Sequence, residues 1–174
     1  RLAELDLREN NDSTAWDTAS NPAEFLIFIL FFFFLKVNAQ NFEINTEKSS
    51  LYWLGKKITG EHYGFINISS GKISIENNQI KSGSFKIDMN SMTCTDIKDQ
   101  SMNKKFLGHL KSDDFFGTAE YPFAQLEVIS STEFKSNKCT VKGKLTIKGK
   151  TDIITFEVNK DQSNYIAKLE IDRS

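Results

Sequence analysis

The two histidines of this chain are its clearest candidates for chemistry. His109 lies in the stretch FLGHLKSDDFF, residues 106–116, four positions before Asp113. On a helix, side chains at this spacing share a face, so the pair could form part of a metal site. A zinc site usually needs three or four close ligands, and a third ligand, such as His62, could come only through the fold.

Catalysis has less support, because the sequence contains no Gly-x-Ser-x-Gly elbow and only two histidines that could serve as a base. The same stretch also has a structural interpretation. His109 can satisfy backbone groups at a loop junction, and Ser112 or Asp113 can cap a helix or turn. Phe115 and Phe116 can anchor the segment in the core. We favour this interpretation and predict no catalytic residue, no enzymatic activity and no metal site.

Residues 25–35 read FLIFILFFFFL, eleven apolar residues without a break. This run is shorter than the roughly 20 residues that cross a membrane, but it falls within the range of about 7–15 for the core of a signal peptide. The small residues Val37 and Ala39 follow at positions typical of a cleavage site. We therefore predict export to the periplasm or the medium, with residues 25–39 as signal region and Gln40 as the new N-terminus.

Residues 1–24 do not fit a signal peptide, which should begin with a basic segment, because they carry six acidic residues and only two basic ones. We expect this upstream segment to be disordered and the folded domain to span residues 40–174. The net charge of −1 gives no argument for a nucleic-acid partner. Cys94 and Cys139 could pair in an exported protein, but nothing in the sequence brings them together.

Beyond residue 40 the apolar residues alternate with polar ones, which is typical of half-buried antiparallel strands. Turn-like separators such as SSGK (69–72) and ENNQ (76–79) divide the strands, and their regular spacing indicates a barrel or sandwich. Only residues 96–116 break the pattern, with apolar residues at roughly helical spacing. The predicted strands are 62–70, 72–76, 82–90, 124–130, 140–149, 153–158 and 164–172.

Several ordered motifs resemble the YceI-like polyisoprenoid-binding family, over about residues 41–172. They are W-x-G-K from Trp53, G-x-H-x-G from Gly60, GSFKIDMNSM from Gly83, LGHLKSDDFF from Leu107, Tyr121–Pro122, and VKGKLTIKGKT from Val141. The resemblance implies an all-β, antiparallel, lipocalin-like barrel of about eight strands, with one short helical insertion. Family members usually continue past the point where this chain stops, so we expect a barrel that is incompletely closed or a truncated chain.

The resemblance also implies a binding protein, one that holds an isoprenoid, quinone-like or fatty chain in its interior for transport, storage or sequestration. No cofactor other than this lipid is expected, nor stable membrane insertion of the mature protein. A homodimer is left open. The alternation predicts these inward, lipid-contacting residues: Ile66, Ile68, Phe85, Ile87, Met89, Leu126, Val128, Leu145, Ile147 and Phe156.

We expect the segment carrying His109, Phe115 and Phe116 to fold over one end of the tunnel. Two alternatives remain at this point. One is a metal- or redox-linked exported protein that uses His62 and His109, and the other is a structural or stress protein whose barrel interior is filled by its own side chains.

Overall fold

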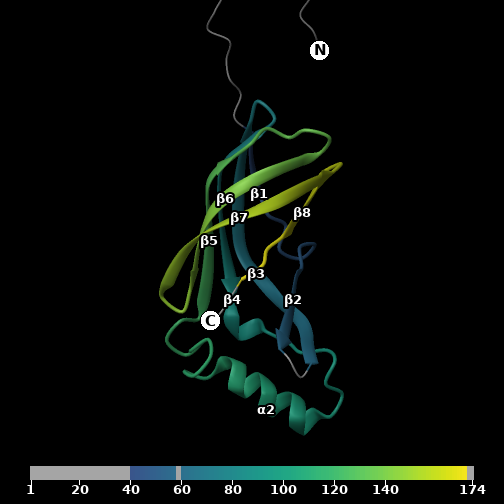
Figure 1. Ribbon diagram of the computed structural model, residues 1–174, viewed down its shortest axis with the longest axis vertical. Helices are drawn as coiled ribbons and strands as arrows, with labels where there is room; N and C mark the ends of the chain where they lie inside the picture. Colours follow the sequence, from purple (N-terminus) through teal and green to yellow (C-terminus); the bar gives the residue numbers. More distant parts are fainter. Residues whose placement is uncertain (1–39, 58–59, 172–174) are drawn as a thin grey trace, which may run out of the picture. The chain divides into compact units, whose positions relative to one another are not determined.

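The structure, a computed structural model, describes residues 40–57 and 60–171. The expectations for residues 1–24 and 25–39 therefore lie outside the described residues. Strands dominate the fold, and one α-helix interrupts them (Figure 1). The elements are β1 (Gln40–Glu43), β2 (Leu51–Lys57), β3 (Gly60–Glu76), β4 (Gln79–Asp88), the 3-10 helix η1 (Met89–Ser91), α2 (Gln100–Lys111), β5 (Phe123–Ser131), β6 (Lys138–Ile147), β7 (Lys150–Asp161) and β8 (Asn164–Lys168).

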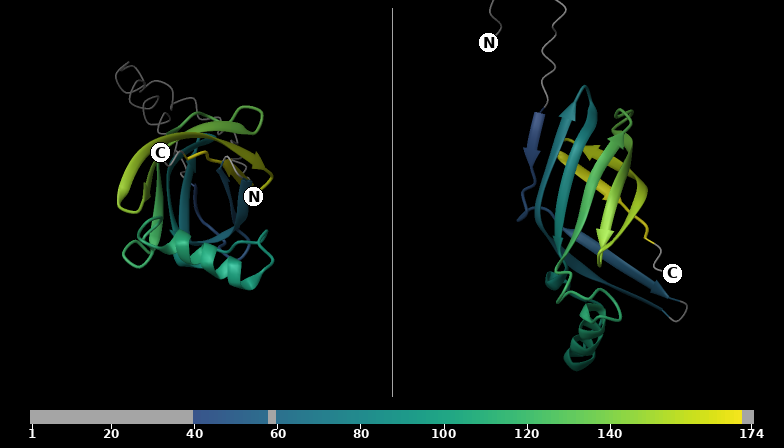
Figure 2. Two further views of the ribbon diagram at one scale, coloured as in Figure 1. Left: turned by 60° about the horizontal axis from the view of Figure 1, so that its bottom comes forward. Right: turned by 90° about the vertical axis from the view of Figure 1, so that its left-hand side faces the viewer.

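The strands form one antiparallel sheet in the order β1-β3-β4-β5-β6-β7-β8, and β2 also pairs with β3. The long strand β3 pairs with both β2 and β1, with β2 along its first half and with β1 along its second half. The sheet curls around on itself (Figure 2). Among the described residues β8 pairs only with β7, so the sheet forms a partly open barrel. The predicted fold class, an antiparallel barrel with a helical insertion, is confirmed.

The prediction of a turn at residues 69–72 is wrong. β3 continues through this stretch as a single strand of 17 residues with a β-bulge, where the register shifts between Ile68 and Ser70. The small residues that resembled a turn allow the strand to bend instead. The bulge also shifts the alternation by one residue, which puts Ile73 on the same side of the sheet as Ile66 and Ile68.

The tight turns occur where the sequence places residues that tolerate a positive φ. Asn77 and Asn78, between β3 and β4, have φ values of 49° and 57°, and Lys148 and Gly149, between β6 and β7, have 50° and 71°. Two central residues with positive φ are typical of the type I′ turn, whose twist matches that of a β-hairpin. These turns therefore help to fix the register of the strands on both sides.

Helix α2 confirms the helical interruption expected within residues 96–116. The Asp99 side chain caps its start by accepting a hydrogen bond from the Met102 N–H at 2.8 Å. At its end the Ser112 N–H donates to the carbonyls of Gly108 and His109. The helix lies across one end of the curled sheet (Figures 1 and 2). Within the described residues, no helix is both long and apolar enough to cross a membrane.

Most of the buried apolar residues form two clusters. The first lies among the strands, and its buried members are Ile73, Ile80, Phe134, Cys139, Val141, Phe156 and Val158. The second lies where the sheet meets α2, and its buried members are Ile66, Met89, Met92, Leu110 and Ala124.

Candidate functional site

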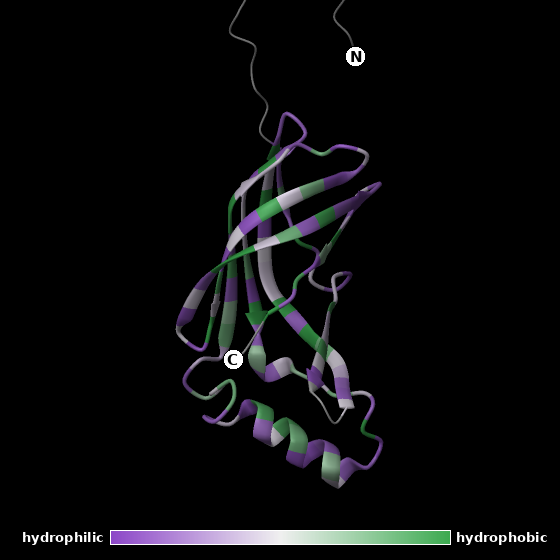
Figure 3. Ribbon diagram, viewed as in Figure 1, coloured by the Kyte–Doolittle hydropathy of each residue, from purple (hydrophilic) through white to green (hydrophobic). Residues whose placement is uncertain are grey.

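The concave face of the sheet carries the residues that the sequence predicted to contact lipid. Burial alternates along β6, and apolar and polar residues alternate with it (Figure 3). All ten predicted residues are buried or half-buried. Met89 differs in one respect, since it belongs to η1 and not to the end of a strand. The buried members are Ile66, Met89, Leu145 and Phe156, and the half-buried members are Ile68, Phe85, Ile87, Leu126, Val128 and Ile147.

Three of the ten, Ile68, Phe85 and Leu145, belong to neither core cluster. The strand register connects their positions, because Phe85 on β4 lies opposite Leu126 on β5, which lies opposite Leu145 on β6. Ile68 on β3 lies opposite Ile87, the next inward residue of β4. An apolar band therefore runs across four adjacent strands, and it meets both core clusters, because Leu126 packs against the first and Ile87 against the second.

Neighbouring side chains cover the inward-facing glycines beside this band. A Cβ added to Gly143 would lie 3.0 Å from Leu126 Cδ1, and one added to Gly83 would lie 3.0 Å from Val128 Cγ2. Both distances are shorter than ordinary van der Waals contacts between carbons. Part of the interior is thus filled by the protein's own side chains. This observation favours the alternative of a barrel with a filled interior.

The segment predicted to cover one end of the tunnel lies at the α2 end of the sheet. Phe115 and Phe116 are half-buried and pack against the second core cluster, with their ring centroids 4.7 Å apart. His109 is exposed, and its ring lies 5.9 Å from that of Phe115. Asp113 is exposed as well. Among the described residues, His109 and Asp113 belong to no group of three side chains close enough to bind one metal ion.

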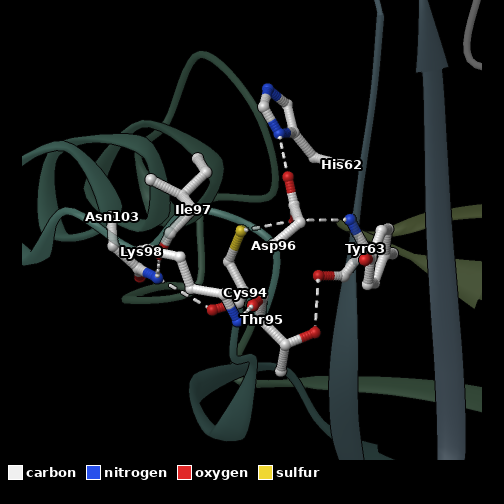
Figure 4. A network of polar contacts seen from close by, with 8 residues as sticks. All are labelled: His62, Tyr63, Cys94, Thr95, Asp96, Ile97, Lys98 and Asn103. Atoms are coloured by element: carbon white, nitrogen blue, oxygen red, sulfur yellow. Dashed lines mark hydrogen bonds and ion pairs between the residues drawn. The ribbon is translucent and has the colours of Figure 1, made fainter.

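The second histidine, His62, lies in a polar network that sequence reasoning missed (Figure 4). Its Nδ1 lies 2.7 Å from Asp96 Oδ2. The other carboxylate oxygen, Oδ1, accepts the Tyr63 N–H at 2.9 Å and the Cys94 thiol at 3.2 Å. One carboxylate thus joins a strand residue to the chain that leads into α2. The only signal in the sequence was the spacing of Cys94 and Asp96, since residues two apart in an extended chain share a face.

The segment from Ser91 to Asp96 takes the place of a strand along the first half of β3. Its backbone donates at Thr93 N to the Phe65 carbonyl and at Thr95 N to the Tyr63 carbonyl. Its side chains accept three N–H groups of β3 in return: Asn67 N–H binds Ser91 Oγ, Phe65 N–H binds Thr93 Oγ1 and Tyr63 N–H binds Asp96 Oδ1. Side-chain oxygens therefore accept hydrogen bonds from the N–H groups of β3 along the part of its edge where β4 does not pair with it.

The network does not have the electrostatics of a cysteine nucleophile. Burial, and next the hydrogen bond to Asp96, raise the pKa of the Cys94 thiol above its ordinary value of 9.0. A reactive cysteine needs the opposite shift and a base within reach. The hydrogen-bond partner of this thiol is the carboxylate and not the imidazole, so the geometry does not activate it.

The carboxyl group of Asp96 predicts a pH dependence of stability. Hydrogen bonds from the Tyr63 N–H and then from the His62 ring hold its pKa well below the ordinary value of 3.8. A lowered folded-state pKa contributes stability that is complete above the unfolded-state pKa and is lost as the pH falls through the folded-state pKa. We expect the stability advantage of wild type over Asp96→Asn to be constant near pH 5 and to shrink below about pH 4. Chemical denaturation of both proteins from about pH 5 to about pH 2 checks this, and an advantage that grows in acid would contradict it.

The fold and the concave apolar face together define an antiparallel barrel of the lipocalin-like kind. More particularly, the chain belongs to the family with the YceI-like domain, whose model matches residues 42–174. Solved structures to which the chain is similar include BcnA from Burkholderia cenocepacia, at 23% identity and a TM-score of 0.41 over 67% of this chain. The YCEI protein of Campylobacter jejuni gives 17% identity and a TM-score of 0.40 over 70% of this chain.

The chain spans only 58% of the length of the BcnA chain and 55% of the length of the Campylobacter jejuni chain. A comparison with curated proteins found no match.

Proposed function

We propose that this protein is exported and that it binds a long apolar chain, such as a polyisoprenoid, a quinone-like lipid or a fatty acid or amide, for transport, storage or sequestration. The observation that carries the proposal is the apolar band across β3, β4, β5 and β6, with Ile68, Phe85 and Leu145 outside both core clusters. Membership in the YceI-like family supports a binding protein over an enzyme.

The physical basis of this binding would be the hydrophobic effect. Each buried methylene contributes about 0.8 kcal/mol, so a segment of about ten methylenes contributes about 8 kcal/mol before the losses of freedom on association. Aliphatic and aromatic side chains suffice for such a site, and binding requires no reactive group on the concave face. The ligand's polar head would remain toward the open side of the barrel, where its hydration is retained.

The test is to extract the purified full-length protein with organic solvent and to identify the released molecules by mass spectrometry. We expect a long-chain lipid at about one molecule per protein, either co-purified or taken up after mixing with a polyprenol or a long fatty acid. A protein that neither carries nor takes up such a lipid would contradict the proposal. That result would favour the filled-barrel alternative, to which the covered glycines Gly83 and Gly143 point.

A further inference from the structure

Three different metal-binding side chains meet where β3 adjoins the segment that leads to α2. A ring nitrogen of His62, Cys94 Sγ and a carboxylate oxygen of Asp96 all lie within 4.8 Å of one another. Within residues 40–57 and 60–171, no other group of three His, Cys, Asp or Glu side chains comes this close. We infer that this trio is a binding site for a divalent cation of the zinc class, separate from the apolar band.

The donor set is the one that zinc prefers. Imidazole nitrogen, thiolate and carboxylate oxygen bind Zn²⁺ at about 2.0–2.3 Å, which places tetrahedral donors about 3.3–3.8 Å apart. The present hydrogen bonds are 2.7 Å from His62 Nδ1 to Asp96 Oδ2 and 3.2 Å from the Cys94 thiol to Asp96 Oδ1, so they end on different oxygens of the carboxylate. The three ligand atoms, which lie within 4.8 Å of one another, need to move by about 1 Å to reach this spacing. As a cation enters, the thiol proton leaves to solvent, and the neutral His62 ring keeps its proton on the nitrogen that does not bind the cation.

The surroundings hold the three ligands in place. The side-chain amide of Asn103 donates to the carbonyls of Cys94 and Ile97, at 2.8 and 2.9 Å, and so fixes the chain on both sides of Asp96. The Tyr63 N–H can remain on Asp96 Oδ1 while Oδ2 binds the cation. Such outer contacts orient the ligands and raise the affinity of a metal site.

The site is open on one side. The side chains of His62 and Asp96 are 30% and 18% exposed, whereas Cys94 is buried. A cation can therefore enter from solvent, and a water molecule can complete the fourth position, as in zinc sites with three protein ligands. A cation bound here would fasten the start of β3 to the segment before α2.

The test is a titration of the chelator-treated, reduced full-length protein with Co²⁺, followed by displacement with Zn²⁺. Cobalt bound to a thiolate gives a charge-transfer absorption band, which reports on the Cys94 sulfur directly. We expect a band that saturates at one Co²⁺ per protein and that Zn²⁺ removes. Cys94→Ser should abolish the band, and His62→Gln should weaken Co²⁺ binding by about 100-fold or more.

The chain offers a matched control for each variant. Cys139 is also a free, buried cysteine, but it lies in the first core cluster, and His109 is the other histidine. Cys139→Ser and His109→Gln should keep the wild-type band and affinity. Wild type without a saturable band would overturn the inference, as would a band that survives Cys94→Ser or disappears in Cys139→Ser. Denaturation of each variant without metal establishes that it is folded before the titration is interpreted.

Discussion

Replacing Gly64 with alanine should lower the free energy of unfolding by about 3 kcal/mol or more. A Cβ at this position would lie 2.7 Å from the carbonyl carbon of Thr93 and closer still to its oxygen. Both atoms belong to the backbone, so no side chain can rotate away to make room. The chain from Thr93 to Asp96 would have to move, and its hydrogen bonds to Phe65 and Tyr63 would weaken with it.

Gly108→Ala is the control for this prediction. Gly108 lies within α2, and a Cβ there would meet nothing within 4 Å. Alanine in an exposed helix is more stable than glycine by about 0.5–1 kcal/mol, so this variant should gain stability. Chemical denaturation followed by circular dichroism measures both. Equal stability of Gly64→Ala and wild type would show that the segment after η1 does not pack against β3 as described.

Placing a charge in the apolar band should remove lipid binding. Phe85 is half-buried at the centre of the band, opposite Leu126. In Phe85→Asp a bound apolar chain would have to desolvate the new carboxylate without a partner, which should weaken binding by about 100-fold or more. The measurement is a titration with a fluorescent long-chain fatty acid.

Ser82→Asp is the matched control, because Ser82 is an exposed residue of the same strand whose side chain alternates to the other face. It introduces the same charge and should leave the affinity within about twofold, since an exposed charge remains hydrated. Circular dichroism of both variants shows whether the sheet is intact. Undiminished binding by folded Phe85→Asp would place the ligand elsewhere.

The general fold could be predicted because alternation is a local property. In β6 every second residue faces the core, so the inward positions of Val141 and Leu145 follow from the sequence itself. β1 and β2 were missed because their residues do not alternate in this way. All four residues of β1 are exposed, and β2 begins with Leu51, Tyr52, Trp53 and Leu54, which are apolar on both faces.

The polar network could not be predicted, because its contacts depend on tertiary structure. His62 and Asp96 are 34 residues apart, and only the path of the chain after η1 brings them together. The bulge in β3 was missed for a related reason. Ser69, Ser70 and Gly71 fit a turn as well as a bulge, and the pairing with β4 decides between the two.

The most direct test of the account is the lipid content of wild type, Phe85→Asp and Ser82→Asp, expressed, purified and extracted in parallel and measured by mass spectrometry. We expect about one long-chain lipid per molecule in wild type and in Ser82→Asp, and almost none in folded Phe85→Asp. If all three carry the same amount, or if none carries any after exposure to lipid, the concave apolar band is not a lipid-binding site.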